Sequence, residues 1–335
     1  MAMVIGHTLH ALLNSTARAS FWVQRYWELR GVTAPLFLLV SGWAVVAALD
    51  FRPGAARASY GRRLRRALLL VFLGYLLHWP GWDVVRSLGW SEALVARLFE
   101  FDALQCIGVS LLVGATVLVL APGNRSRALA LAVLAVSIPL ASGAVWRLGP
   151  HLPIALRQAT GTEGSHFPLF PWAGFFFAGA LAAQLFRLLR PGWPQGLALG
   201  VLGAGVIGVT MQLPQDWSPT SAWVVAFRVG EGLLVLGAVN FAPVRLSRRL
   251  APLGRLSLWV YVLHLPVVYG WADIPGLADR VGATLELGPA LLVGLGLLLA
   301  SCAVARLGRW LRRLTRPWRP AAAALSPLFG DSQRV

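Results

Sequence analysis

The stretch GVTAPLFLLVSGWAVVAALD, residues 31–50, is followed almost at once by RPGAARASYGRRLRR, residues 52–66. The first stretch is nearly all apolar and has about the 20 residues that a helix needs to cross roughly 30 Å of hydrocarbon. The second carries six arginines, and arginine-rich segments next to a span stay on the cytoplasmic side of a membrane. Together the two stretches predict a membrane crossing and its direction.

The composition of the whole chain agrees with a membrane protein. Of the 335 residues, 57% are hydrophobic and only 13% are charged, and the mean hydropathy is +0.66. These values lie outside the range of a soluble globular domain. The formal net charge of +17 comes from arginines clustered beside apolar segments, where membrane sorting and anionic lipid headgroups explain them. We therefore expect membrane lipid as a partner and exclude nucleic acid.

Apolar stretches of this kind recur along the chain. The candidate spans are 1–15, 31–50, 66–80, 102–121, 128–146, 169–187, 196–212, 222–242, 256–271 and 287–306. Most arginines fall in every second connection and in the C-terminal tail, whereas the intervening loops hold most of the acids. The pattern predicts an all-α transmembrane bundle of about ten helices with both termini in the cytoplasm. One membrane domain is expected over residues 1–316, followed by a disordered, Ala- and Pro-rich cytoplasmic tail, residues 317–335.

Two histidines lie inside the first apolar stretch. His7 and His10 are three residues apart, so they share one face of a helix. Ionisable side chains within a span are costly and usually face a partner or a cavity, which makes each a candidate site residue. A neutral imidazole can act as a general base or carry an acyl group. The alternative is a hydrogen bond between helices.

Three further spans carry polar side chains. Asp102 and Gln105 share a face where the fourth span begins, so Asp102 is either a site residue or the N-cap of that helix. Arg228 and Glu231 are one turn apart in the eighth span and predict an ion pair, which either joins helices or lines a cavity for an acceptor. His264, in the ninth span, either bonds a neighbouring helix or belongs to the site.

The sixth span begins irregularly. His166 precedes the sequence FPLFPW, residues 167–172, whose two prolines disfavour a regular first turn. Irregular backbone at membrane depth survives only where it faces protein or a water-filled cavity. We interpret this stretch as the rim of a pocket.

Four stretches together resemble a known family. They are TAPLFLLVSG (33–42), DALQCIG (102–108), FPLFPWAG (167–174) and GRLSLWVYVLH (254–264). They resemble the bacterial membrane proteins related to the heparan-α-glucosaminide N-acetyltransferase catalytic domain, a branch of the transmembrane acyltransferases. The resemblance covers roughly residues 1 to 310.

This resemblance implies an enzyme of the bacterial inner membrane that needs no metal. It would take an acyl group, usually acetyl, from acetyl-CoA on the cytoplasmic side and deliver it to a hydroxyl or amine of a sugar-like acceptor on the far side. An intramembrane histidine is the expected catalytic residue. MVIGHTLH, residues 3–10, matches the first-helix region that carries it, and His7 matches better than His10. In the family an Asp and an Arg-Gly pair precede this histidine, and the present sequence begins after that point.

The remaining polar residues suit supporting roles in such a mechanism. Asp102 or Glu231 would orient the imidazole, and Arg228 or a backbone N–H would face the developing oxyanion. Gln105, His166 and His264 would bind the acceptor. The coenzyme's phosphates would be held by arginines of two cytoplasmic connections. These arginines are Arg62, Arg63, Arg66, Arg248 and Arg255. The alternative is that they serve only topology and lipid contact.

Two other functions remain open from the sequence. A transporter or flippase would use Arg228, Glu231 and His264 as a translocation path, but such proteins often show duplicated halves, which are not evident here. The third possibility is a membrane protein without catalytic activity that acts as a partner of another protein.

Overall fold

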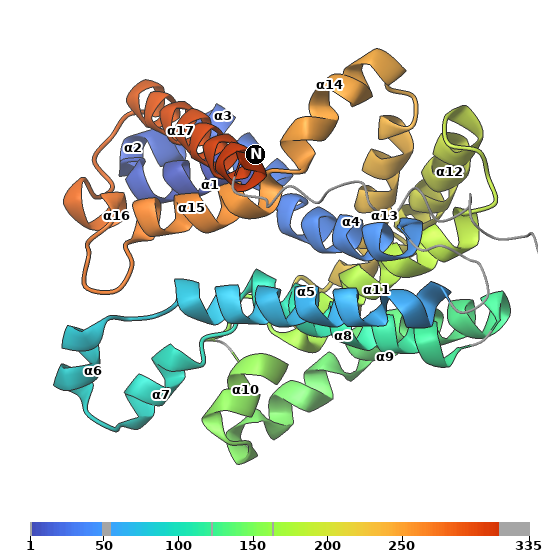
Figure 1. Cartoon of the computed structure of the whole chain (residues 1–335), viewed down its shortest axis with the longest axis horizontal. Coiled ribbons are helices and arrows are strands. Elements are labelled where there is room, and N and C mark those ends of the chain that lie inside the picture. Colours follow the sequence, from blue (N-terminus) through green and yellow to red (C-terminus); the bar gives the residue numbers. More distant parts are fainter. Residues whose placement is uncertain (1, 49–54, 122, 163, 315–335) are drawn as a thin grey trace, which may run out of the picture.

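The computed structural model describes residues 2–48, 55–121, 123–162 and 164–314, and the regular structure in these ranges is helical (Figure 1). The predicted all-α class is thereby confirmed. The predicted tail, residues 317–335, lies outside the described residues.

Seven helical segments are long and apolar enough to span a membrane. One of them combines α3 (Phe21–Arg30) with α4 (Thr33–Ala47), and another joins α9 (Asn124–Leu148) to the short 3-10 turn η1 (Gly149–His151). The other five are α8 (Ala103–Leu120), α11 (Leu169–Phe186), α12 (Trp193–Thr210), α13 (Ala222–Val239) and α17 (Leu287–Leu314). The chain is therefore a multi-pass membrane protein.

Two further apolar helix pairs are bent, and one predicted span is short. The axis turns by 70° between α5 (Ala55–Leu77) and α6 (Trp82–Leu88), and by 50° between α14 (Val244–Gly254) and α15 (Ser257–Tyr269). Counting each bent pair as one span gives up to nine. The first predicted span, residues 1–15, corresponds to α1 (Ala2–Leu12), which is too short to cross and ends early because the next residues cap another helix. The Asn14 side chain accepts a hydrogen bond from the Ala17 N–H at 2.7 Å, as an N-cap does.

Four short helices occupy the connections. They are α2 (Ser15–Ala19), α7 (Glu92–Leu98), α10 (Ile154–Thr160) and α16 (Leu277–Arg280). Figure 1 shows α6 and α7 beyond one end of α5.

The largest core cluster joins α4, α5, α8 and α11. Leu38, Leu104 and Phe176 are at most 1% exposed within it. The backbones of α4 and α11 approach so closely that a Cβ on Gly42 would overlap the Phe176 carbonyl. Small residues allow such approaches in membrane proteins, where close packing replaces the hydrophobic drive between helices.

A separate cluster joins α1, α15 and α17, which lie together in Figure 1. Val4, Leu256, Val260 and Ala305 form its buried part. At the other end of α1, the Asn14 N–H donates to the carbonyl of Leu285, just before α17. The first helix therefore runs antiparallel to the last, and both pack against the helix that carries His264. Which end faces the cytoplasm stays a prediction from the arginine pattern.

Candidate active site between helices α1, α8 and α15

His7 meets a tyrosine from a distant part of the chain. Its Nδ1 lies 2.9 Å from the hydroxyl oxygen of Tyr269, at the end of α15. The two rings are nearly perpendicular, at 88°, with their centroids 5.5 Å apart. The sequence held no spacing signal for this pair because the two residues are 262 positions apart. The contact places the predicted histidine of α1 in a polar interface with α15.

His264 completes this group and is fully buried. Its Nδ1 lies 2.8 Å from the Val260 carbonyl oxygen. Because a carbonyl only accepts hydrogen bonds, Nδ1 carries the hydrogen and Nε2 keeps the lone pair. This Nε2 is buried and has no hydrogen-bond partner among the described residues, which is rare for a buried polar atom. The ring centroid of His7 is 5.4 Å away, so an unpaired acceptor lies beside the predicted base.

A positive charge lies next to His7. Arg30 is the last residue of α3, and a Cβ on Gly6 would lie only 3.1 Å from its Nε. The glycine before His7 thus lets the guanidinium approach α1. Arg30 is within electrostatic reach of both His7 and Tyr269. Sequence reasoning missed Arg30, which reads as one of many arginines beside a span.

His10 has different neighbours from His7. It is exposed, and its ring packs edge-on against Trp27 with centroids 6.3 Å apart. Although His7 and His10 share a helix face, their side chains therefore contact different residues.

Asp102 has two functions in the structure. One carboxylate oxygen accepts the Ala103 N–H at 2.7 Å, and the Gln105 side chain accepts the Asp102 N–H at 3.2 Å, so together they cap α8. The other oxygen accepts a hydrogen bond from the Tyr261 hydroxyl at 3.1 Å. Tyr261 in turn packs edge-on against His264, with centroids 5.7 Å apart. The N-cap and the site interpretation of Asp102 are therefore compatible.

A cluster of acids and histidines continues outward from Asp102. His166 Nδ1 lies 3.2 Å from a Glu100 carboxylate oxygen, and His78 Nε2 lies 3.7 Å from Asp102 and 4.0 Å from Glu100. The hydrogen bond that His166 donates to the Glu100 carboxylate raises the pKa of His166, and the same bond lowers the pKa of Glu100. Of these, His78 and Glu100 are members that the sequence did not single out.

The predicted irregular start of α11 is present. Phe170 has non-helical dihedral angles (φ −105°, ψ 113°) and precedes a cis proline, Pro171. Its carbonyl accepts a hydrogen bond from the Trp146 indole at 2.8 Å. The irregular backbone thus faces protein, as expected at membrane depth.

The predicted ion pair of Arg228 and Glu231 forms, but outside the group of His7, Tyr269 and His264. The two side chains meet at 2.8 Å along α13, and the Arg228 guanidinium lies over Trp217, 5.5 Å from the ring centroid. A Cβ on Gly31 would lie 2.8 Å from Arg228. The pair therefore packs against the turn between α3 and α4, one residue from Arg30.

The five arginines predicted to bind the coenzyme are dispersed. Arg63 donates to the Val45 carbonyl at 3.0 Å, whereas Arg62, Arg66 and Arg248 are exposed. Arg255 lines a cavity of about 330 Å³. Among the described residues, no group of three or more His, Cys, Asp or Glu is arranged to hold a metal ion.

Comparison with known proteins identifies the family. The family model Acyl_transf_3, described as an acyltransferase domain, matches residues 1–306. No curated protein and no solved structure matches the chain. The match supports the transmembrane acyltransferase group but does not single out the branch related to heparan-α-glucosaminide N-acetyltransferase. Polar rings from α1 and α15 thus meet inside a chain that belongs to the Acyl_transf_3 family of membrane acyltransferases.

Proposed function

We propose that this protein transfers an acetyl group from cytoplasmic acetyl-CoA to a hydroxyl or amine of a sugar-like acceptor on the outer side of a bacterial inner membrane. The observation that carries the proposal is the meeting of His7, Tyr269 and His264 between two helices of an apolar bundle. Ionisable groups in such a place are functional by default. The family match supports the reaction class.

His7 acts as the general base. With its Nδ1–H donating to the Tyr269 hydroxyl oxygen, its Nε2 carries the lone pair that takes the proton of the acceptor. The acceptor oxygen or nitrogen then bonds to the thioester carbonyl carbon, and the carbon–sulfur bond breaks. The protonated His7 gives its proton to the leaving thiolate, so free coenzyme A forms and the base is regenerated. In the alternative route His7 first accepts the acetyl group from the thioester and then passes it to the acceptor.

Two neighbours support the transfer. The unpaired Nε2 of His264 accepts a hydrogen bond from the acceptor and holds it beside His7. Arg30 supplies positive charge to the oxyanion that develops on the thioester carbonyl. This role suits Arg30 better than Arg228, because Glu231 already neutralises Arg228.

The cluster around Glu100 suits a polyhydroxylated acceptor. Glu100, Asp102, His78 and His166 offer carboxylates and imidazoles within 4.0 Å of one another in successive pairs. Sugars present many hydroxyl groups, which both donate and accept hydrogen bonds, so alternating acceptors and donors of this kind match them. The cluster connects to His264 through Tyr261.

The test follows radiolabelled acetyl groups in membrane vesicles that contain the full-length protein. Label moves from acetyl-CoA to the cell-envelope fraction in the wild type. His7→Ala should reduce the rate by about 10²–10⁴-fold, as loss of a general base does. His10→Ala should keep most of the rate, since His10 is exposed and packs on Trp27.

Thr8→Val is the matched control for the integrity of α1. It removes only a hydroxyl that bonds the Val4 carbonyl one turn back on the same helix. Undiminished transfer by His7→Ala, with protein levels equal to those of the control, removes His7 from the mechanism.

A further inference from the structure

The cavity beside Arg255 has an unusual lining. It is a half-open space of about 330 Å³ between the junction of α14 with α15 and the last turns of α17, and its lining residues are Pro252, Arg255, Arg306, Arg309 and Trp310. In Figure 1 the end of α17 lies next to this junction. Three arginines and one tryptophan therefore line a single space.

Within the described part of the chain, none of the three arginines has a carboxylate partner. Among the described residues, the arginines paired with carboxylates are Arg25, Arg86 and Arg228, none of which lines the cavity. Three positive charges around one space repel one another, and an anion between them removes this repulsion. Guanidinium groups bind phosphate with two parallel hydrogen bonds, so the favoured anion is a phosphate.

Trp310 narrows the class of ligand. Its side chain is 55% exposed, so part of the indole face is open. Flat heterocyclic bases stack on aromatic side chains. A ligand that carries both phosphates and such a base is a nucleotide. The volume is near the lower end of about 300–1,000 Å³ for ligand pockets, which suits the head of a nucleotide ligand and leaves the rest of the ligand outside.

The cavity and the candidate active site lie along the same helices. Arg255 and Arg306 directly adjoin Leu256 and Ala305, which pack with Val4 in the α1–α15–α17 cluster. His7 is one turn beyond Val4. His264 follows Arg255 by nine residues, roughly 14 Å at the rise of an α-helix. A ligand held by its phosphates in the cavity has to pass over this packed cluster to reach the histidines.

We infer that this cavity binds the phosphorylated adenosine end of the acyl-CoA donor, an inference that rests on the function proposed above. Arg255, Arg306 and Arg309 hold the phosphates, and Trp310 stacks on the adenine. The pantetheine arm passes over the α1–α15–α17 cluster and presents the thioester to His7. The family match ends at residue 306, so Arg309 and Trp310 lie outside the matched region.

The test measures binding without turnover. The full chain is placed in nanodiscs of zwitterionic lipid, and its affinities for coenzyme A, adenosine 3′,5′-bisphosphate and inorganic phosphate are measured by calorimetry. Arg309→Gln should weaken coenzyme A and the bisphosphate at least tenfold. Trp310→Ala should weaken both nucleotides and leave inorganic phosphate unchanged, since only the nucleotides stack.

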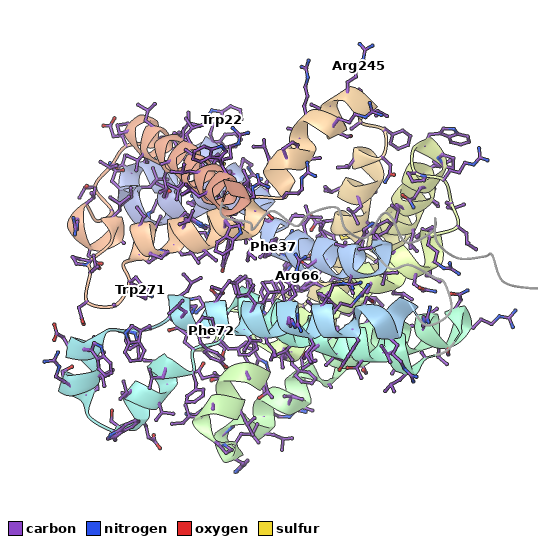
Figure 2. All side chains as sticks on the ribbon, in the orientation of Figure 1. Trp22, Phe37, Arg66, Phe72, Arg245 and Trp271 are labelled. Atoms are coloured by element: carbon purple, nitrogen blue, oxygen red, sulfur yellow. The ribbon has the colours of Figure 1, made fainter. Side chains whose placement is uncertain are left out.

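Arg245→Gln is the matched control. Arg245 is an exposed arginine of α14, the helix that ends just before Arg255, and it projects away from the bundle (Figure 2), so its loss should leave every affinity unchanged. The Arg309→Gln, Trp310→Ala and Arg245→Gln variants should have equal thermal stability. Equal affinity for coenzyme A in Arg309→Gln, Trp310→Ala and the wild type overturns the inference.

A second experiment distinguishes a nucleotide ligand from a lipid headgroup, because both carry phosphate. Nanodiscs with anionic phosphatidylglycerol are compared with the zwitterionic ones. Displacement of coenzyme A by the anionic lipid, with no effect of Trp310→Ala on either ligand, assigns the cavity to a headgroup and overturns the inference. Failure of the proposed function looks different: His7→Ala then transfers acetyl groups normally, whatever the cavity binds.

Discussion

The seam between α4 and α11 and the group formed by α1, α15 and α17 join helices in opposite ways. In the first, Gly42 and Gly179 bring two backbones into direct contact, because a Cβ on either would overlap a carbonyl of the other helix. In the second, rings of His7, His264 and Tyr269 stand between the helices. Backbone contact leaves no room for a ligand, whereas polar rings leave hydrogen-bonding atoms for one. The α4–α11 pair therefore serves close packing, whereas α1 and α15 carry the polar groups of the candidate active site.

The largest expected effect comes from forcing the glycine seam apart. Gly42→Ala places a methyl group against the Phe176 carbonyl, which only a shift of backbone can relieve. The cost should reach or exceed the usual range of about 1–3 kcal/mol for overpacking. We expect strongly reduced yield and a lower midpoint of thermal unfolding in detergent.

Gly205→Ala is the control for this substitution. A Cβ on Gly205, in α12, meets nothing within 4 Å, so its thermal midpoint should equal or slightly exceed that of the wild type, because alanine is the better helix former. Equal midpoints for Gly42→Ala and Gly205→Ala would show that α4 and α11 are not in contact as described.

An intermediate effect is expected from Tyr269→Phe, which alters the polar group without changing its packing. The ring stays, but the hydrogen bond to His7 at 2.9 Å is lost. Hydrogen bonds to charged groups contribute about 1.5–3 kcal/mol, so kcat should fall about 10- to 100-fold while thermal stability changes little. The acetyl-transfer rate and the thermal midpoint measure the two effects.

Tyr75→Phe controls for the loss of a tyrosine hydroxyl. Tyr75 lies in α5 and packs edge-on against Phe99, away from His7, so its variant should retain the wild-type rate. A Tyr269→Phe rate equal to that of Tyr75→Phe would remove the hydroxyl from the mechanism.

The smallest effect is expected at the exposed end of the polar cluster. The Glu100 carboxylate raises the pKa of His166, so the imidazolium persists above the ordinary value of 6.5. Its contribution to stability is complete below that value and is lost as the pH rises through the raised pKa. Glu100, whose pKa is lowered from 4.5, loses its contribution as the pH falls through its own lowered pKa. The charged pair is therefore fully formed between these two limits.

Glu100→Gln should bring the pKa of His166 down toward its ordinary value, measured by NMR titration of the imidazole. The His166 side chain is 65% exposed, so solvent screens the charges and the effect on stability should be small. An unchanged titration curve for His166 would contradict the contact with Glu100. Asp83→Asn, in an exposed pair with Arg86, is the control that should leave His166 unaffected.

The spans were predictable because hydropathy reports length and composition, which the bilayer fixes. The bends between α5 and α6 and between α14 and α15 were not, since a hydropathy window carries no direction. His7, His264 and Asp102 were found as ionisable residues in apolar sequence. Tyr261 and Tyr269 were missed because a tyrosine in a span needs no explanation until its partner, far away in sequence, is placed beside it.

Asp102 links the architecture to the chemistry. One of its oxygens fixes where α8 begins, and the other holds the Tyr261 hydroxyl beside His264. A slip of α8 along its axis would therefore drag Tyr261 with it and disturb the surroundings of His264. The same carboxyl group therefore caps a central helix and positions a neighbour of His264 in the candidate active site.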